Sequence, residues 1–186
     1  MFFLGIKLEI EGNLDESCDL ILINHQSMLD IIVMEHLHNR NIAWVAKKEI
    51  TDLFFFGHII KAPRMISIDR ENKAGLIHLL SEAKDRLSKG RPIAMFPEGT
   101  RSDGTYIGEF KAGAKMVGNK FNLKVQPVVM FNTRNIVNSQ KMEAAPGVVK
   151  VIYLEAIVAS KDTSWYEDCE KNMKEVFEKE YKNYVS

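Results

Sequence analysis

The sequence predicts a single α/β domain in which helices flank a mostly parallel or mixed sheet of about seven strands. Short apolar runs alternate along the chain with segments whose apolar residues recur at helical spacing, and this alternation is typical of helices packed on a sheet. Several runs are apolar without interruption, as in central strands buried on both faces. No repeat, linker or low-complexity tract divides the chain, so we expect one domain over residues 1–186.

The predicted strands are short segments that are rich in apolar or β-branched residues and bounded by turn-forming or charged residues. They cover residues 7–12, 19–24, 41–46, 64–69, 91–96, 124–131 and 148–158. In an open α/β sheet, ligands bind in the crevice beyond the carboxyl ends of the strands. Polar residues that directly follow these segments are therefore the first candidates for a functional site.

Helices are expected in the segments between the strands. Ser27 is a suitable N-cap for a helix over residues 28–38. Asp30 then lies in the first turn, where a carboxylate is favoured by the positive end of the helix. A second helix is predicted to end near Gly90. Its apolar positions are Leu76, Leu79, Leu80, Ala83 and Leu87.

The last part of the chain is predicted to form a longer amphipathic helix. Ser164 and Glu167 have the spacing of a capping box at its start. The apolar residues of this segment share one helical face. They are Trp165, Cys169, Met173, Val176, Phe177, Tyr181 and Tyr184. We expect this helix to pack on the sheet as a lid or a brace.

Composition limits the classes of partner. The 25 lysines and arginines balance 25 aspartates and glutamates, so no nucleic-acid partner is expected and any basic site must be local. Cys18 and Cys169 lie far apart without a metal-ligand pattern, which predicts free thiols in a reducing compartment. The sequence contains no run approaching the roughly 20 apolar residues of a membrane span, so no transmembrane segment is expected.

The stretch NHQSMLD places an imidazole directly after a predicted strand and a carboxylate five residues later, at His25 and Asp30. Histidine exchanges protons near neutral pH. A carboxylate bonded to one ring nitrogen fixes the tautomer, and the other nitrogen can then accept a proton from an alcohol. The structural alternative, in which Asp30 only caps the helix and His25 only makes a hydrogen bond, is left open by this pair alone.

The stretch FPEGTRSDG follows the fifth predicted strand and should lie at the same edge of the sheet as His25. The planar guanidinium of Arg101 suits a phosphate, and backbone N–H groups around Gly99 can form an anion-binding nest. An ordinary polar turn is the alternative. Lys111 near the start of another helix, and Lys47 and Arg70 just past two other strands, add cations to a possible phosphate site.

Four blocks of sequence, taken together and in order, resemble those of the glycerolipid acyltransferases, above all the 1-acyl-sn-glycerol-3-phosphate (lysophosphatidic acid) acyltransferases. The blocks are NHQSMLD at 24–30, ISIDR at 66–70, FPEGTRS at 96–102 and VQPV at 125–128. The first and third blocks are the specific ones. The resemblance covers most of the chain, from Ile6 to Val158.

The resemblance implies the glycerolipid acyltransferase fold, with His25 as general base and Asp30 as the residue that orients it. It also implies an acceptor site in which Arg101 and Lys47 grip a glycerol phosphate. The residues that it assigns to substrate binding are Lys47, Arg70, Glu98, Gly99, Thr100, Arg101 and Lys111.

The implied reaction transfers a fatty acyl group from acyl-CoA or acyl carrier protein to the sn-2 hydroxyl of lysophosphatidate, which forms phosphatidate. A thioester has a good leaving group, so no covalent acyl-enzyme, metal or cofactor is expected. Three alternatives are acylation of glycerol 3-phosphate, acylation of another lysophospholipid, and non-catalytic binding of a lipid phosphate. The last alternative would not need His25 with Asp30.

The expected location is the cytoplasmic face of the inner membrane, as a peripheral protein, because the acceptor is a lipid and the thiols are expected to be reduced. Many members of the family carry hydrophobic helices ahead of the first block, whereas this sequence begins close to its first strand. Either an anchor is missing from this sequence or the enzyme docks peripherally. Residues 50–63 are the candidate docking segment, with a buried core helix as the alternative.

Overall fold

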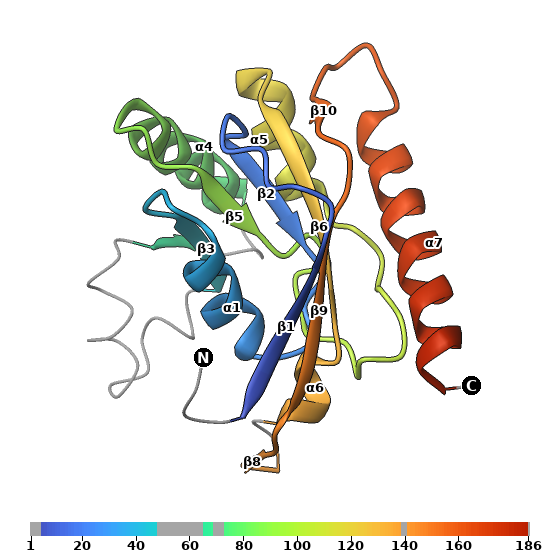
Figure 1. Cartoon of the computed structure of the whole chain (residues 1–186). Coiled ribbons are helices and arrows are strands. Elements are labelled where there is room, and N and C mark those ends of the chain that lie inside the picture. The colour runs from blue at the N-terminus through green and yellow to red at the C-terminus, as the bar shows by residue number, and fades with distance from the viewer. Residues whose placement is uncertain (1–4, 48–64, 69–72, 139–140, 186) are drawn as a thin grey trace.

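The computed structural model describes residues 5–47, 65–68, 73–138 and 141–185, and within these residues eight strands form one sheet (Figure 1). The strands are β1 (Ile6–Glu11), β2 (Leu20–Ile23), β3 (Ala43–Lys47), β4 (Ile66–Ile68), β5 (Ile93–Met95), β6 (Lys124–Phe131), β9 (Gly147–Tyr153) and β10 (Ile157–Val158). The helices are α1 (Leu29–Leu37), α4 (Lys73–Ser88), α5 (Ala112–Phe121), α6 (Thr133–Ile136) and α7 (Trp165–Val185).

The sheet is mixed and mostly parallel, as predicted. Its order is β1-β9-β6-β2-β5-β3-β4, with β10 paired to β6. The five strands from β6 to β4 in this order run parallel, whereas β9 and β10 are antiparallel to β6. The carboxyl ends of β5, β2 and β6 are therefore neighbours at one edge of the sheet.

Both faces of the sheet are covered by helices, which makes three layers. Successive side chains of a strand point to opposite faces. In β2, Leu20 and Leu22 accordingly join one core with apolar side chains of α4, α5 and α7, while Ile21 and Ile23 join a second core with those of α1 and α6. This arrangement explains why β2 is apolar without interruption and has no exposed residue.

The helix predicted to stop at Gly90 is α4, which ends at Ser88. Gly90 has a positive φ of 69°, and the amide N–H groups of Gly90 and Arg91 bond back to the carbonyl oxygens of Leu87 and Arg86. This hydrogen-bond pattern is a Schellman motif, which requires the left-handed conformation that glycine adopts at no steric cost.

The final helix α7 is a brace. Figure 1 shows α7 running alongside the sheet next to β6. Its predicted apolar stripe packs on β6, where the Phe131 ring lies 5.2 Å from that of Phe177. The prediction of a capping box at its start is wrong. The hydroxyl of Ser164 donates to the carboxylate of Asp168, and the carboxylate of Glu167 pairs with Lys115 instead.

The seventh predicted strand is divided into β9 and β10. Between the pairs Tyr153–Val128 and Ile157–Val125, three residues face two residues of β6, which is a β-bulge. Pro127 explains the break, because proline has no N–H for the ladder and its carbonyl instead accepts the N–H of Leu154. The sequence analysis also missed a small hairpin of β7 (Val137–Asn138) and β8 (Glu143–Ala144).

Replacing Phe177 by alanine is expected to lower the free energy of unfolding by about 3–5 kcal/mol, because the buried ring leaves a cavity between α7 and β6. Denaturant unfolding measures the change. Ile77→Ala on the exposed side of α4 is the control and should cost less than about 0.5 kcal/mol. Equal losses in the two variants would contradict the role of α7 as a brace.

Candidate active site

The two polar stretches singled out from the sequence meet at the carboxyl edge of the sheet. His25 follows β2, and the loop that begins at Phe96 follows β5. These two strands are parallel neighbours in which Leu22 lies opposite Met95. The same edge carries the end of β6, whose Val128 lies opposite Ile23 of β2.

The predicted contact between His25 and Asp30 is present. The imidazole Nδ1 lies 2.8 Å from Asp30 Oδ2. The same carboxylate oxygen accepts the backbone N–H groups of Gln26 and Ser27 at 2.8 and 2.9 Å. An oxygen that receives these donors is an acceptor, so in the neutral ring the proton lies on Nδ1 and the lone pair on Nε2. The imidazole is therefore in the tautomer that a general base requires.

Exposure differs between the two partners. The side chain of Asp30 is fully buried, whereas 12% of the His25 side chain is accessible. Helix α1 begins at Leu29, one residue later than predicted, with Met28 at its N-cap position. The Ser27 hydroxyl nevertheless accepts the N–H of Leu29 at 3.2 Å. The start of α1 thus shields the carboxylate and leaves part of the imidazole open to solvent.

The main chain of His25 is held by the loop after β5. Its N–H donates to Glu98 Oε1 at 2.7 Å, and its carbonyl accepts the N–H of Ser102 at 2.8 Å. The second oxygen of Glu98 accepts the N–H of Gly108 at 2.6 Å. Burial raises the pKa of Glu98, and the hydrogen bonds from the two backbone N–H groups oppose the rise. Glu98 therefore acts as a buried clamp between the two stretches.

A stack of rings fixes one face of the imidazole. The ring of Phe96 lies 3.7 Å from that of His25 with an interplanar angle of 12°, and Trp44 of β3 stacks on Phe96 at 5.3 Å. The indole Nε1 of Trp44 donates to the carboxylate of Glu35 at 2.6 Å. The imidazole is thus bounded by Phe96 on a face and by Asp30 at Nδ1.

Cations lie near this edge at several of the predicted positions. Arg101 is exposed on the loop, next to Ser102, and Lys111 is exposed at the N-cap position of α5. Lys47, predicted just past the third strand, is instead the last residue of β3, which ends one residue later than predicted. Arg70 lies outside the described residues, as does the docking segment 50–63. Arg101 and Lys111 are thus placed on the loop that holds His25.

The other two residues predicted to bind substrate belong to the same loop. Gly99 is half-buried with a positive φ of 76°, and its N–H donates to the carbonyl of Phe96 at 3.0 Å. Thr100 is exposed next to it. The turn is therefore tight at Gly99 and opens toward solvent at Thr100 and Arg101.

The loop is also anchored to α7. The Tyr166 hydroxyl donates to the carbonyl of Lys111 at 2.6 Å, and Glu170 accepts the N–H of Phe110 at 3.3 Å. These contacts favour a brace over a lid, because α7 supports the loop that holds His25.

The sequence analysis missed two residues of α6, which follows β6. The hydroxyl of Thr133 donates to Asp30 Oδ1, and the guanidinium of Arg134 donates to the carbonyl of Ser102 at 3.3 Å. Their position in the sequence could have indicated them, because both residues follow a predicted strand whose carboxyl end lies at this edge.

Thiol and metal chemistry find no support in the described part of the chain. Cys18 and Cys169 are free, as predicted, and burial raises their pKa values to about 11 and about 12, which keeps both thiols protonated at neutral pH. His38 is buried, and its Nδ1 accepts the N–H of Arg40 at 3.0 Å. The described residues contain no group of three or more side chains suited to a metal ion.

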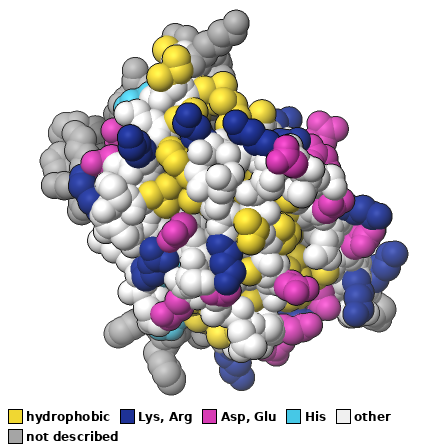
Figure 2. Space-filling view, turned by 90° about the horizontal axis from the view of Figure 1, so that it is seen from above, with side chains coloured by type: hydrophobic (Ala, Val, Ile, Leu, Met, Phe, Trp, Pro, Cys, Tyr) yellow, Lys and Arg dark blue, Asp and Glu magenta, His cyan; other side chains and the backbone are white. Residues whose placement is uncertain are grey.

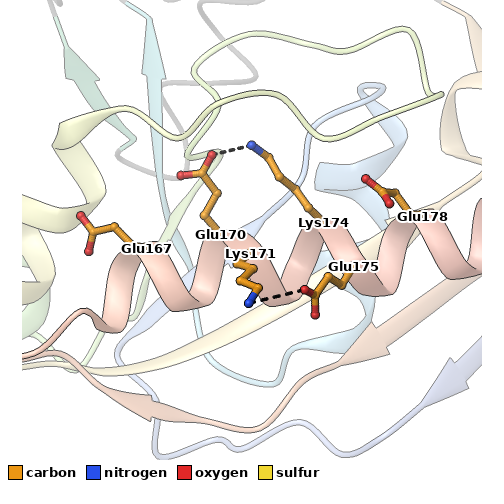
Figure 3. A pocket seen from close by; sticks show the side chains of 6 residues that line it. All are labelled: Glu167, Glu170, Lys171, Lys174, Glu175 and Glu178. Atoms are coloured by element: carbon orange, nitrogen blue, oxygen red, sulfur yellow. Dashed lines mark hydrogen bonds and ion pairs between the residues drawn. The ribbon is translucent and has the colours of Figure 1, made fainter.

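A surface hollow lies along α7. It is lined by Glu167, Glu170, Lys171, Lys174, Glu175 and Glu178 (Figure 3). Lys174 pairs with Glu170, and Lys171 pairs with Glu175, each along the helix. Figure 2, which looks down on the end of the molecule that is uppermost in Figure 1, likewise shows charges of both signs on that end. Neither surface has the one-signed charge of an anion site.

Comparisons with known proteins agree on one family. The family model described as Acyltransferase matches residues 6–131. The chain is 42% identical to a 1-acyl-sn-glycerol-3-phosphate acyltransferase of Helicobacter pylori over 95% of this chain and 76% of that protein. It is 31% identical to a lyso-ornithine lipid O-acyltransferase of Brucella abortus, over 70% of this chain and 51% of that one.

A solved structure shares the fold. The crystal structure of the 1-acyl-sn-glycerophosphate acyltransferase PlsC from Thermotoga maritima superposes with a TM-score of 0.76 at 23% identity. The match covers 98% of this chain and 74% of that one.

Replacing Glu98 by glutamine is expected to lower the free energy of unfolding by about 1–3 kcal/mol, because an amide NH₂ would then face one of the two backbone N–H groups that the carboxylate now accepts. Denaturant unfolding at neutral pH measures the loss. Glu109→Gln, at an exposed position of the same loop, should leave stability unchanged. A Glu98 variant as stable as the Glu109 variant would refute the clamp.

Proposed function

Because the chain belongs to the acyltransferase family, we propose that it transfers a fatty acyl group from a thioester to the sn-2 hydroxyl of 1-acylglycerol 3-phosphate, forming phosphatidate. The observation that carries the proposal is the contact of His25 with buried Asp30, next to the loop that bears Arg101. The acceptor is suggested by the names of relatives, among them the protein from Helicobacter pylori and a human 1-acyl-sn-glycerol-3-phosphate acyltransferase beta that is 29% identical.

The proposed step uses His25 as a base and then as an acid. Nε2 accepts the proton of the acceptor hydroxyl while the hydroxyl oxygen attacks the thioester carbonyl carbon. The tetrahedral intermediate collapses, the carbon–sulfur bond breaks, and the imidazolium returns the proton to the leaving thiolate. The products are an ester and a thiol, and no acyl group is attached to the protein.

The surroundings of the imidazole suit this cycle. The imidazolium formed in the first half lies beside the ionised carboxylate of Asp30 and against the face of the Phe96 ring. A carboxylate stabilises the positive charge, and an aromatic face adds a cation–π interaction. The charge that develops on the base is therefore stabilised by groups already in place.

The acceptor phosphate is proposed to bind Arg101 and Lys47, with Lys111 and Arg70 as further cations and with Glu98, Gly99 and Thr100 shaping the loop. Arg101 directly precedes Ser102, whose N–H donates to the carbonyl of His25. A guanidinium offers a phosphate two parallel N–H donors. Such a grip would orient the sn-2 hydroxyl toward Nε2.

The donor is proposed to be acyl-CoA or acyl carrier protein, since both present the same thioester. A peripheral position at the cytoplasmic face of the inner membrane fits a lipid acceptor, and residues 50–63 remain the proposed docking segment. Among the described residues, none of the helices has the length and apolar character that a membrane crossing requires.

A second candidate acceptor is another lysolipid. The relative from Brucella abortus is named a lyso-ornithine lipid O-acyltransferase, so members of this family differ in the head group of the acceptor. A panel of lysophosphatidate, glycerol 3-phosphate and lyso-ornithine lipid, assayed with one acyl-CoA, separates these acceptors. Phosphatidate formation from lysophosphatidate should have the highest kcat/KM.

His25→Ala is expected to lower kcat by about 10²–10⁴-fold, because the alcohol loses its general base. Phosphatidate formation from lysophosphatidate and an acyl-CoA measures the effect. His36→Ala, at an exposed position of α1, is the control and should retain full activity. Wild-type protein that binds lysophosphatidate but forms no phosphatidate would instead indicate the non-catalytic binding module.

Arg101→Ala is expected to raise KM for lysophosphatidate by about 10–100-fold with a smaller change in kcat, because a charge-assisted contact to the phosphate is lost. Lys161→Ala, in the turn before α7, removes a cation at an exposed position and should leave KM unchanged. An unaltered KM in the Arg101 variant would place the phosphate elsewhere.

A further inference from the structure

Thr133 connects the end of β6 to the carboxylate of Asp30. It is the first residue of α6 and has no exposed surface. Its hydroxyl donates to Asp30 Oδ1, the carboxylate oxygen that does not face the imidazole. Thr133 thus contacts the acid that orients His25 without contacting His25 itself.

The carboxylate of Asp30 is held at both oxygens. Oδ2 receives His25 Nδ1 and two backbone N–H groups, all of them from the turn between β2 and α1. Among the described residues, Thr133 is the donor to Oδ1. Rotation of the carboxylate about its Cβ–Cγ bond would break both sets of contacts, so the Thr133 hydroxyl fixes the plane in which Oδ2 meets Nδ1.

Gln26 completes a small buried network. The Oε1 atom of Gln26 lies 3.2 Å from the hydroxyl oxygen of Thr133. The Nε2 atom of Gln26 is buried without a partner among the described residues. The hydroxyl has one proton, and the charged carboxylate is the stronger acceptor for it. If the amide is turned by 180°, Nε2 donates to the Thr133 hydroxyl while Thr133 donates to Asp30.

The position of Thr133 is itself determined by long-range contacts. Asn132, just before it, adopts the left-handed conformation with φ 72°, which asparagine tolerates better than most residues, and its Nδ2 donates to the carbonyl of Val148 at 2.8 Å. After α6, the carbonyl of Val137 accepts the Ser27 hydroxyl at 2.6 Å. Helix α6 is therefore anchored to β9 and to the start of α1, with Thr133 facing Asp30.

We propose that Thr133 is a positioning residue for acyl transfer, which acts through Asp30 to hold the imidazole of His25 in its reactive tautomer and orientation. The inference rests on the function proposed above. A misplaced catalytic group lowers turnover more than it lowers ground-state binding of the substrate. Loss of the hydroxyl should therefore appear in kcat rather than in KM.

Thr133→Val tests the proposal, because valine has nearly the same shape and replaces the hydroxyl by a methyl group that cannot donate a hydrogen bond. We expect kcat for phosphatidate formation to fall by about 10–100-fold while KM for lysophosphatidate changes by less than about threefold. Thr133→Ser, which keeps the hydroxyl, should restore most of kcat. Ile136→Val is the matched control, because it truncates a buried residue of the same helix whose side chain packs against Gly147, and it should lower the melting temperature but not kcat.

A second measurement does not depend on turnover. In proton NMR, the Nδ1–H of His25 that bonds Asp30 should give a far-downfield signal, which is identified by its loss in His25→Ala. The signal should shift or broaden in Thr133→Val, and should be retained in Thr133→Ser and Ile136→Val. If Thr133→Val does not fold, Thr133→Cys replaces it, since a thiol is a weak donor of similar size.

The outcomes separate the two proposals. A Thr133→Val protein with the kcat and the downfield signal of Ile136→Val would overturn the positioning role. Wild-type protein that forms no phosphatidate would overturn the proposed function, and the NMR signal would still decide whether Thr133 orients the pair. A parallel loss of kcat in Thr133→Val and Ile136→Val, with the signal intact in both, would reduce Thr133 to a purely structural residue.

Discussion

The candidate site depends on the burial of one carboxylate. Removing an ionised carboxylate from water costs several kcal/mol, and the cost is offset only when hydrogen bonds satisfy its oxygens. Asp30 receives four donors, and each hydrogen bond to a charged group contributes about 1.5–3 kcal/mol, so the gain is of the same order as the penalty. Because these bonds need both oxygens in fixed places, they also fix the imidazole of His25 before any substrate arrives.

The sheet brings the parts of this site together. The central strands β5, β2 and β6 are parallel neighbours, so three chain segments emerge side by side at their carboxyl ends. One supplies His25, the second supplies the loop with Glu98, and the third supplies Thr133. Helices cover both faces of these strands, and the fully buried strand β2 therefore gives His25 a rigid starting point.

The last helix extends this support to the loop after β5. Through Tyr166 and Glu170, α7 holds the backbone just before α5, while its apolar stripe packs on β6. The loop in turn holds the main chain of His25 through Glu98 and Ser102. Helix α7 contributes no predicted catalytic group, but it stabilises the position of His25 indirectly, through the loop.

The sequence by itself determined most strands and the main helices, because apolar periodicity is a local property of the chain. The five-residue spacing of His25 and Asp30 indicated their pairing, which the resemblance of the four blocks favoured over a purely structural role. The sequence also placed FPEGTRS at the same edge of the sheet, since that follows from the strand ends. Only the tertiary structure decided that Glu98 clamps backbone N–H groups, that Pro127 divides the last predicted strand, and that Thr133 reaches Asp30. Each of these contacts joins residues 73, 27 or 103 positions apart, and the pairing of strands that creates them is not written in any local pattern.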